Sequence, residues 1–245
     1  MAGKSDKLMV DGKRVDGRDP SDLRNVRMQV GVLHDADGSA FIEWGKNKVL
    51  CGVYGPRECI PRHQANPYKS LIKCRYTMSP FSSAEEHGRS GPNRRSTEIS
   101  KVIREVFDNL IITESFPKTE IDIYMEVLQA DGGTRTSSIT AASLALANAG
   151  IPMRDMVAAV AAGKANNTLM IDLGKEEDNH GQSDMALAIS HRKKELLLVQ
   201  MDGMLTRDEL EKLLIMAEQS ANKIHEMQAA SLKNVYENPE ESFKL

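Results

Sequence analysis

Residues 129–138 combine two glycines with hydroxyl and guanidinium side chains, and no other stretch of this sequence suggests chemistry so clearly. Two adjacent glycines allow a sharp turn and a close approach of the backbone to a ligand. A helix is predicted to begin after them, and the free N–H groups of a helix start favour an anion. Hydroxyl donors and a forked guanidinium suit phosphate. The candidate phosphate-binding residues are therefore Gly133, Thr134, Arg135 and Thr136, with Ser137 beside them.

A plainer interpretation of this stretch stays open from the residues alone. A glycine turn with a threonine N-cap and a solvated arginine would have the same sequence. The stretch is not a Walker loop, because no Gly-Lys-Ser/Thr follows at the required spacing.

Arg94 and Arg95 form a second candidate anion site, just before a helix predicted to begin near Ser96. Cations are disfavoured at the start of a helix by roughly 0.3–1 kcal/mol each. A pair of arginines there is better explained if a phosphate shares the site. The alternative is two exposed arginines whose unfavourable energy is screened by salt.

Asp178 and Asp184 form a candidate acidic pair, in a segment predicted as an acidic loop over residues 172–184. Two carboxylates that face bound phosphates would suit Mg²⁺, which prefers few carboxylates plus water and phosphate oxygens. One of them could also transfer a proton. Taken alone, a solvated acidic loop is the simpler interpretation, and His180 is more typical of a surface histidine than of a ligand. The sequence has no H-x-x-x-H or H-E-x-x-H spacing that would indicate zinc.

The elements that would position these residues alternate between strands and helices. Apolar residues alternate with polar ones over 120–128, which predicts a strand, and the nearly all-apolar stretch up to Asn148 predicts a buried helix. Further strands are expected at 26–32, 39–44, 47–54, 71–78, 157–163, 168–173, 185–189 and 196–201. Amphipathic helices are expected from about Ser96 and, after a capping box at Thr206–Glu209, to about Tyr236. This order predicts an α+β fold with mainly antiparallel sheets.

Composition is that of a soluble globular protein. The chain has 245 residues, 40% hydrophobic and 27% charged, and no apolar run long enough to span a bilayer. Its net charge of −3 excludes a generally basic surface that coats nucleic acid, so basic residues in local groups suggest an enclosed anion site. These groups are Arg57, Arg62, His63 and Lys69; Arg89, Arg94 and Arg95; and Arg135.

We expect a cytoplasmic protein, because the N-terminus lacks an apolar signal stretch and three cysteines do not form a disulfide framework. We also expect an arm over 1–24, a single domain over 25–236 and a tail over 237–245.

Taken together, the motifs resemble the RNase PH family, and within it the catalytic subunits of the archaeal exosome. The resemblance runs through nearly the whole chain in the order of the family. It is carried by Arg14-Val15-Asp16-Gly17-Arg18, Ala36-Asp37-Gly38-Ser39-Ala40, Tyr54-Gly55-Pro56-Arg57-Glu58, Pro61-Arg62-His63, Pro92-Asn93-Arg94-Arg95-Ser96, Asp131-Gly132-Gly133-Thr134-Arg135, Gly150-Ile151-Pro152-Met153-Arg154-Asp155, Glu177-Asp178 and Ser183-Asp184-Met185.

The resemblance implies an RNase PH fold, similar to domain 2 of ribosomal protein S5, and phosphorolysis of RNA from its 3′ end. Inorganic phosphate would be the co-substrate, nucleoside diphosphates the product, and the reverse reaction would add 3′ tails. Residues 133–136 would hold phosphate, and Arg94 and Arg95 would bind the RNA backbone. Asp178 would be the general acid and would share Mg²⁺ or Mn²⁺ with Asp184. Arg62 and His63 would narrow an RNA entry pore.

The same resemblance implies partners. In the archaeal exosome, catalytic and inactive RNase PH-type subunits alternate in a hexameric ring of three heterodimers, with S1-domain cap proteins above it. The substrate would be the 3′ end of single-stranded RNA, and no membrane is involved. Two alternatives remain: a self-sufficient homohexameric RNase PH that trims tRNA 3′ ends, and a non-catalytic RNA-binding ring subunit.

Overall fold

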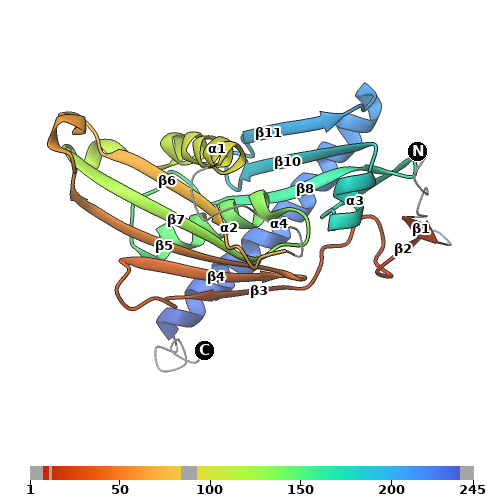
Figure 1. Ribbon diagram of the computed structural model, residues 1–245, viewed down its shortest axis with the longest axis horizontal. Coiled ribbons are helices and arrows are strands. Elements are labelled where there is room, and N and C mark those ends of the chain that lie inside the picture. Colours follow the sequence, from red (N-terminus) through yellow and green to blue (C-terminus); the bar gives the residue numbers. More distant parts are fainter. Residues whose placement is uncertain (1–7, 11–12, 84–92, 238–245) are drawn as a thin grey trace.

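The computed structural model describes the whole chain except residues 1–7, 11–12, 84–92 and 238–245 (Figure 1). Parts of the predicted arm and tail, and Arg89 of the second basic group, lie outside the described residues. No helix of the described part is long and apolar enough to cross a membrane.

A five-stranded sheet forms the first half of the fold, with strand order β3-β4-β5-β7-β6. Its last pair, β6 and β7, is parallel, and the other pairs are antiparallel. In β7 the predicted alternation is confirmed, because Ile123, Met125 and Val127 are buried while Tyr124 and Glu126 are exposed. The strands are β3 (Val26–Val30), β4 (Gly38–Trp44), β5 (Asn47–Glu58), β6 (Leu71–Met78) and β7 (Thr119–Gln129).

A four-stranded antiparallel sheet forms the second half, with strand order β11-β10-β8-β9. Its strands are β8 (Val157–Ala165), β9 (Thr168–Ile171), β10 (Ser183–Ser190) and β11 (Leu196–Gly203). The predicted α+β class with mainly antiparallel sheets is therefore confirmed.

Helix α2 (Thr134–Asn148) lies between the two sheets and contacts β4 and β5 on one side and β8 on the other (Figure 1). Its residues from Thr136 to Leu146 are buried, which explains why the sequence shows no polar face there. Helix α1 (Arg94–Leu110) packs on β6, and the long α4 (Arg207–Glu237) packs on β8, β9 and β3. The predicted capping box at the start of α4 is present, with hydrogen bonds in both directions between Thr206 and Glu209.

Several boundaries differ from the sequence predictions. The predicted acidic loop at 172–184 contains a short helix, α3 (Lys175–His180), whose start is capped by the Glu177 side chain accepting from the Gly174 N–H. β5 continues four residues past Tyr54 to Glu58, because Arg57 and Glu58 still pair with β7 after a bulge. Two short 3₁₀ helices also occur, at Arg62–Gln64 and Thr113–Ser115.

The predicted arm is held against the fold where it is described. A small hairpin, β1 (Met9–Val10) with β2 (Lys13–Arg14), carries Arg14 into the protein. The Arg14 side chain is fully buried. A charge buried this completely has to be paired, and Arg14 is paired with Glu177 of α3.

Candidate active site

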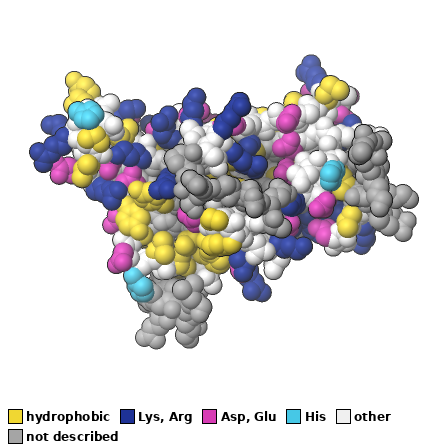
Figure 2. All heavy atoms as spheres, in the orientation of Figure 1, with side chains coloured by type: hydrophobic (Ala, Val, Ile, Leu, Met, Phe, Trp, Pro, Cys, Tyr) yellow, Lys and Arg dark blue, Asp and Glu magenta, His cyan; other side chains and the backbone are white. Residues whose placement is uncertain are grey.

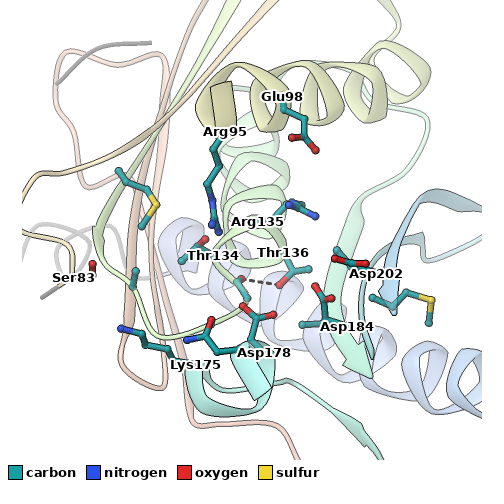
Figure 3. A pocket seen from close by; sticks show the side chains of 18 residues that line it. Ser83, Arg95, Glu98, Thr134, Arg135, Thr136, Lys175, Asp178, Asp184 and Asp202 are labelled. Carbon is teal, nitrogen blue, oxygen red and sulfur yellow. Dashed lines mark hydrogen bonds between the residues drawn. The ribbon is translucent and has the colours of Figure 1, made fainter. Parts of the chain in front are cut away.

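A pocket of about 450 Å³ opens where α1, α2, α3, β10 and β11 meet (Figure 3). Arg95, Arg135 and threonine hydroxyls from α1 and α2 line one wall, together with Glu98 of α1. The carboxylates of α3, β10 and β11 line the other, together with Lys175 of α3. In the space-filling view, Lys and Arg gather along the upper edge over α1, and a row of acidic side chains lies beside them over β10 and β11 (Figure 2). The lining residues include Arg95, Gly133, Thr134, Arg135, Thr136, Asp178, Asp184 and Asp202.

The turn before α2 has the conformation that its two glycines permit. Gly132 and Gly133 have φ of +73° and +69°, in the left-handed region that favours glycine. A Cβ on Gly132 would lie only 2.6 Å from the carbonyl carbon of Gly174, at the start of α3. Glycine at this position therefore lets the start of α3 approach the turn closely.

Two side chains from distant parts of the sequence hold this turn. Buried Asn47 donates to the carbonyl of Gly132 and accepts from the N–H of Asp131. Arg24 donates to the carbonyls of Asp131 and Gly132 and forms an ion pair with Asp172 at 2.6 Å. With its carbonyls held in this way, the turn is fixed before any ligand arrives.

The threonines of the turn have different surroundings. The N-cap of α2 is Gly133, with no side-chain cap, so the alternative of a threonine N-cap is wrong. Thr136 donates its hydroxyl to the Gly133 carbonyl at 2.8 Å. Thr134 Oγ1 accepts from the Tyr76 hydroxyl at 2.9 Å, which leaves the hydroxyl hydrogen of Thr134 to donate to a ligand.

The two adjacent arginines lie in the first turn of α1. The helix begins at Arg94, two residues before the predicted Ser96, because Asn93 caps it by accepting from the Ser96 N–H at 2.7 Å. Both arginines are exposed, but Arg95 lines the pocket and Arg94 is not among the lining residues. The first turn of α1 contains no acidic residue to offset the two cations.

The acidic wall brings together the predicted pair and a third carboxylate. Asp184 lies on β10 directly opposite Asp202 of β11 in the antiparallel register. Like charges opposite each other in a sheet are destabilising. The pKa of Asp184 is raised by its partial burial and then by the charges of Asp178 and Asp202, while Arg135 opposes the rise.

Asp178 lies on α3 and points into the same pocket (Figure 3). Asp178 is exposed, and the protein around its carboxylate removes only part of its hydration. This partial desolvation raises the pKa of Asp178, against the opposing charges of Arg95, Arg135 and Arg24. A raised pKa keeps more of the carboxyl protonated near neutral pH, as a general acid requires. His180, at the end of α3, is exposed and 3.8 Å from Glu176, as expected for a surface histidine.

The described residues contain no group of three or more His, Cys, Asp or Glu side chains placed to hold a metal ion. The pair Asp178 and Asp184 is still compatible with Mg²⁺, because this ion commonly takes one or two carboxylates and completes its shell with water and phosphate oxygens.

Arg62 and His63 lie outside this pocket. They form the short 3₁₀ helix after β5, and Arg62 is exposed and pairs with Glu58 at 2.7 Å. In Figure 1 this segment, drawn in orange, lies at one end of the molecule. It is next to the end of β6 that is farther from α3. An RNA bound in the pocket would therefore have to extend well beyond it to make the predicted contact with Arg62 and His63.

Sequence reasoning missed the residues that hold or complete the site from other elements. Asp202 directly follows the strand predicted at 196–201, and Gln200 lies within that strand. Neither residue carries a sequence signal that marks it as part of a site. Arg24, Asn47 and Asp172 lie far from the turn in sequence, and only the fold brings them to it.

Comparison with known proteins places this site in a family. The family described as "3′ exoribonuclease family, domain 1" (RNase_PH) matches residues 22–152, and its domain 2 matches residues 155–220. The boundary falls between α2 and β8, so the two matches correspond to the two sheets.

Curated relatives are similar along nearly their whole length. The "Exosome complex component Rrp41" of Thermococcus onnurineus is 52% identical over 239 residues, which cover 96% of each chain. The protein of the same name from Archaeoglobus fulgidus is 49% identical, over 95% of this chain and 91% of its own length.

Two solved structures share the fold. Rice (Oryza sativa) Rrp46 superposes with a TM-score of 0.80 at 22% identity, covering 90% of this chain and all of the rice chain. A chain of the Archaeoglobus fulgidus exosome with RNA bound to the active site gives a TM-score of 0.76 at 24% identity, covering 88% and 92%.

Proposed function

We propose that this chain, which belongs to the RNase PH family of 3′ exoribonucleases, degrades RNA from its 3′ end by phosphorolysis as the catalytic subunit of an exosome ring. One observation carries the proposal. One wall of the pocket carries the glycine turn at 133–136 and Arg95, and the other carries Asp178 and Asp184, whose pKa values are raised. Phosphate and the 3′ end of RNA can therefore meet there.

The reaction divides between these two walls. Inorganic phosphate, held by the turn at 133–136, attacks the phosphorus of the terminal phosphodiester. The bond from that phosphorus to the 3′ oxygen of the preceding nucleotide breaks, and a nucleoside diphosphate leaves. Asp178 gives its proton to the departing 3′ oxygen. In the reverse direction the same carboxylate accepts that proton, and a nucleotide is added to the 3′ end.

The main task of such a site is to position the reactants and offset negative charge. Arg95 and Arg135 do this on one wall for the RNA backbone and the attacking phosphate. A divalent ion, Mg²⁺ or Mn²⁺, would be held by Asp184 and by the deprotonated form of Asp178, and would neutralise further charge on the phosphoryl oxygens.

The assembly is part of the proposal. Because relatives about 50% identical are named as exosome components, we infer an inactive RNase PH-type partner in a ring of three heterodimers, with S1-domain caps. Arg62 and His63, distant from the pocket, would then contact RNA on its path towards the active site.

The test uses this chain alone and then with its inactive partner. Each sample is incubated with end-labelled single-stranded RNA and Mg²⁺, with and without phosphate, and the products are identified. We expect nucleoside diphosphates only when phosphate is present, and only with the partner. Activity of the chain alone would favour a homohexameric RNase PH. Monophosphates would mean hydrolysis, and RNA binding without products would favour a non-catalytic ring subunit.

A further inference from the structure

We propose that Gln200 is a positioning residue for phosphate binding. In this proposal it holds the guanidinium of Arg135, and Glu98 fixes the orientation of the Gln200 amide. The inference rests on the proposed function, because it takes Arg135 as the arginine that binds the attacking phosphate.

The three residues form a chain of hydrogen bonds, and both ends of the chain, Arg135 and Glu98, line the pocket. Arg135 Nη1 donates to Gln200 Oε1 at 2.7 Å, and Gln200 Nε2 donates to Glu98 Oε1 at 2.9 Å. Arg135 comes from α2, Gln200 from β11 and Glu98 from α1. The side chain of Arg135 is therefore connected to two elements that lie far away in the sequence.

The hydrogen-bonding chemistry of Arg135 and Glu98 allows only one orientation of the Gln200 amide between them. A guanidinium can only donate hydrogen bonds, and a carboxylate can only accept them. The amide must therefore turn its oxygen to Arg135 and its nitrogen to Glu98. Without Glu98, the amide could rotate and place its NH₂ group against Arg135.

The strand register explains why Gln200 reaches the site. Gln200 lies opposite Ala186 of β10, and Asp202, two residues further along the same face, lies opposite Asp184. Ala186 lines the pocket, and the Gln200 side chain beside it reaches Arg135 of α2. β11 thus contributes both a residue of the acidic wall and the support of the basic wall.

A neutral support is the appropriate one for an arginine that must bind an anion. A carboxylate at position 200 would hold Arg135 but would also offset the charge that phosphate needs. Glutamine orients the side chain without adding a negative charge beside it. The Nε of Arg135 is buried and makes no hydrogen bond within the described residues, so the bond to Gln200 is what orients this guanidinium.

The experiment measures initial rates with varied inorganic phosphate at saturating labelled RNA, and with varied RNA at saturating phosphate, in the assembled ring. Gln200→Met should raise the KM for phosphate by about tenfold, in line with the loss of one hydrogen bond to a charged group. The KM for RNA and the kcat at saturating phosphate should stay near the wild-type values. Gln200→Glu should also raise the KM for phosphate, although it retains an acceptor for Arg135.

Two further variants separate positioning from stability. Glu98→Ala changes an exposed residue of α1 and should raise the KM for phosphate in the same direction but by less, even if Gln200→Met fails to fold. Val199→Met, at an exposed neighbouring position of β11, is the matched control and should behave as wild type.

The outcomes distinguish this inference from the proposed function. If wild type makes no phosphate-dependent products, the proposed function is wrong. If wild type is phosphate-dependent but Gln200→Met and Glu98→Ala keep its KM for phosphate, the positioning role is wrong. Equal increases in both KM values would indicate a general structural role and would also overturn it.

Discussion

Arg14 of the N-terminal hairpin donates two hydrogen bonds to the carboxylate of Glu177, the residue immediately before Asp178. It also donates to the carbonyls of Ile171 and Asp172, at 2.6 and 2.8 Å. Both members of the ion pair are buried, and Glu177 in turn accepts from the Gly174 N–H at the start of α3. The helix that carries Asp178 is therefore held in place by Arg14, which lies 163 positions before Glu177 in the chain.

Removing one member of this pair should destabilise the fold. We expect Arg14→Met to lower the free energy of unfolding by about 3–5 kcal/mol, because it leaves the Glu177 carboxylate buried without its partner. Denaturant titration measures this. Lys13→Met, at the exposed neighbour on the same hairpin, is the control and should change little. Equal stability of the two variants would show that the buried pair does not hold α3.

Asp178→Asn should abolish turnover and spare binding. The amide cannot protonate the leaving oxygen, so we expect kcat to fall by at least about 100-fold while RNA affinity and assembly stay near wild type. Rates, RNA titration and size-exclusion chromatography measure the three properties. Glu176→Gln, an exposed change on the same helix, should remain active. An equal loss of RNA binding in Asp178→Asn would indicate a structural role instead.

Asp184→Asn should stabilise the protein at neutral pH while reducing activity. The folded-state pKa of Asp184 is raised above its ordinary 3.8, so the folded protein binds the proton more tightly than the unfolded chain does. The contribution of Asp184 to the free energy of unfolding of the wild type therefore falls as pH rises through the folded-state pKa. Melting temperatures of the two proteins should diverge across that range.

Well below pH 3.8 the carboxyl is protonated in both the folded and unfolded states, and the advantage of Asp184→Asn should vanish. A melting-temperature difference that stays constant from acid to neutral pH would contradict the raised pKa of Asp184.

Arg95 and Arg94 should contribute unequally to RNA binding. Arg95 lines the pocket and Arg94 does not, so Arg95→Ala should weaken binding of a short single-stranded RNA more than Arg94→Ala. The loss of one phosphate contact should also reduce the slope of log affinity against log salt by roughly 0.7. RNA titrations at several salt concentrations test this, and the double change Arg94→Glu/Arg95→Glu should bind most weakly. Identical behaviour of the two alanine variants would contradict the difference in position.

Much of the fold was predictable, because local pattern and burial agree. Alternation defined β7, and the run of small and apolar residues defined α2 as a helix enclosed on most sides. The capping box identified the start of α4. Boundaries failed where a side chain made a local bond that periodicity does not contain, as with Glu177 at the start of α3 and Asn93 at the start of α1. The single-domain limits of 25–236 remain a prediction.

The candidate site was predictable only in its local parts. The glycine turn and the Arg-Arg pair could be found from residue chemistry, and the structure brings Arg95, Arg135, Asp178 and Asp184 to one pocket. Support from Arg24, Asn47 and Gln200 could not be found, because it depends on long-range packing and strand register. The role of Arg62 and His63 stays a prediction, since both lie away from the pocket.

Helix α2 limits how the family can vary around this site. The helix is surrounded by β4 and β5 on one side and β8 on the other, and its middle is composed of small residues such as Ala141, Ala142 and Ser143. A larger side chain there would have to separate two sheets at once, and overpacking of this kind is costly. Substitutions that change side-chain size should therefore be tolerated more easily in the elements around the pocket than in the middle of α2. Substrate preference should diverge among relatives through α1, α3 and β11, while α2 accumulates few changes in size.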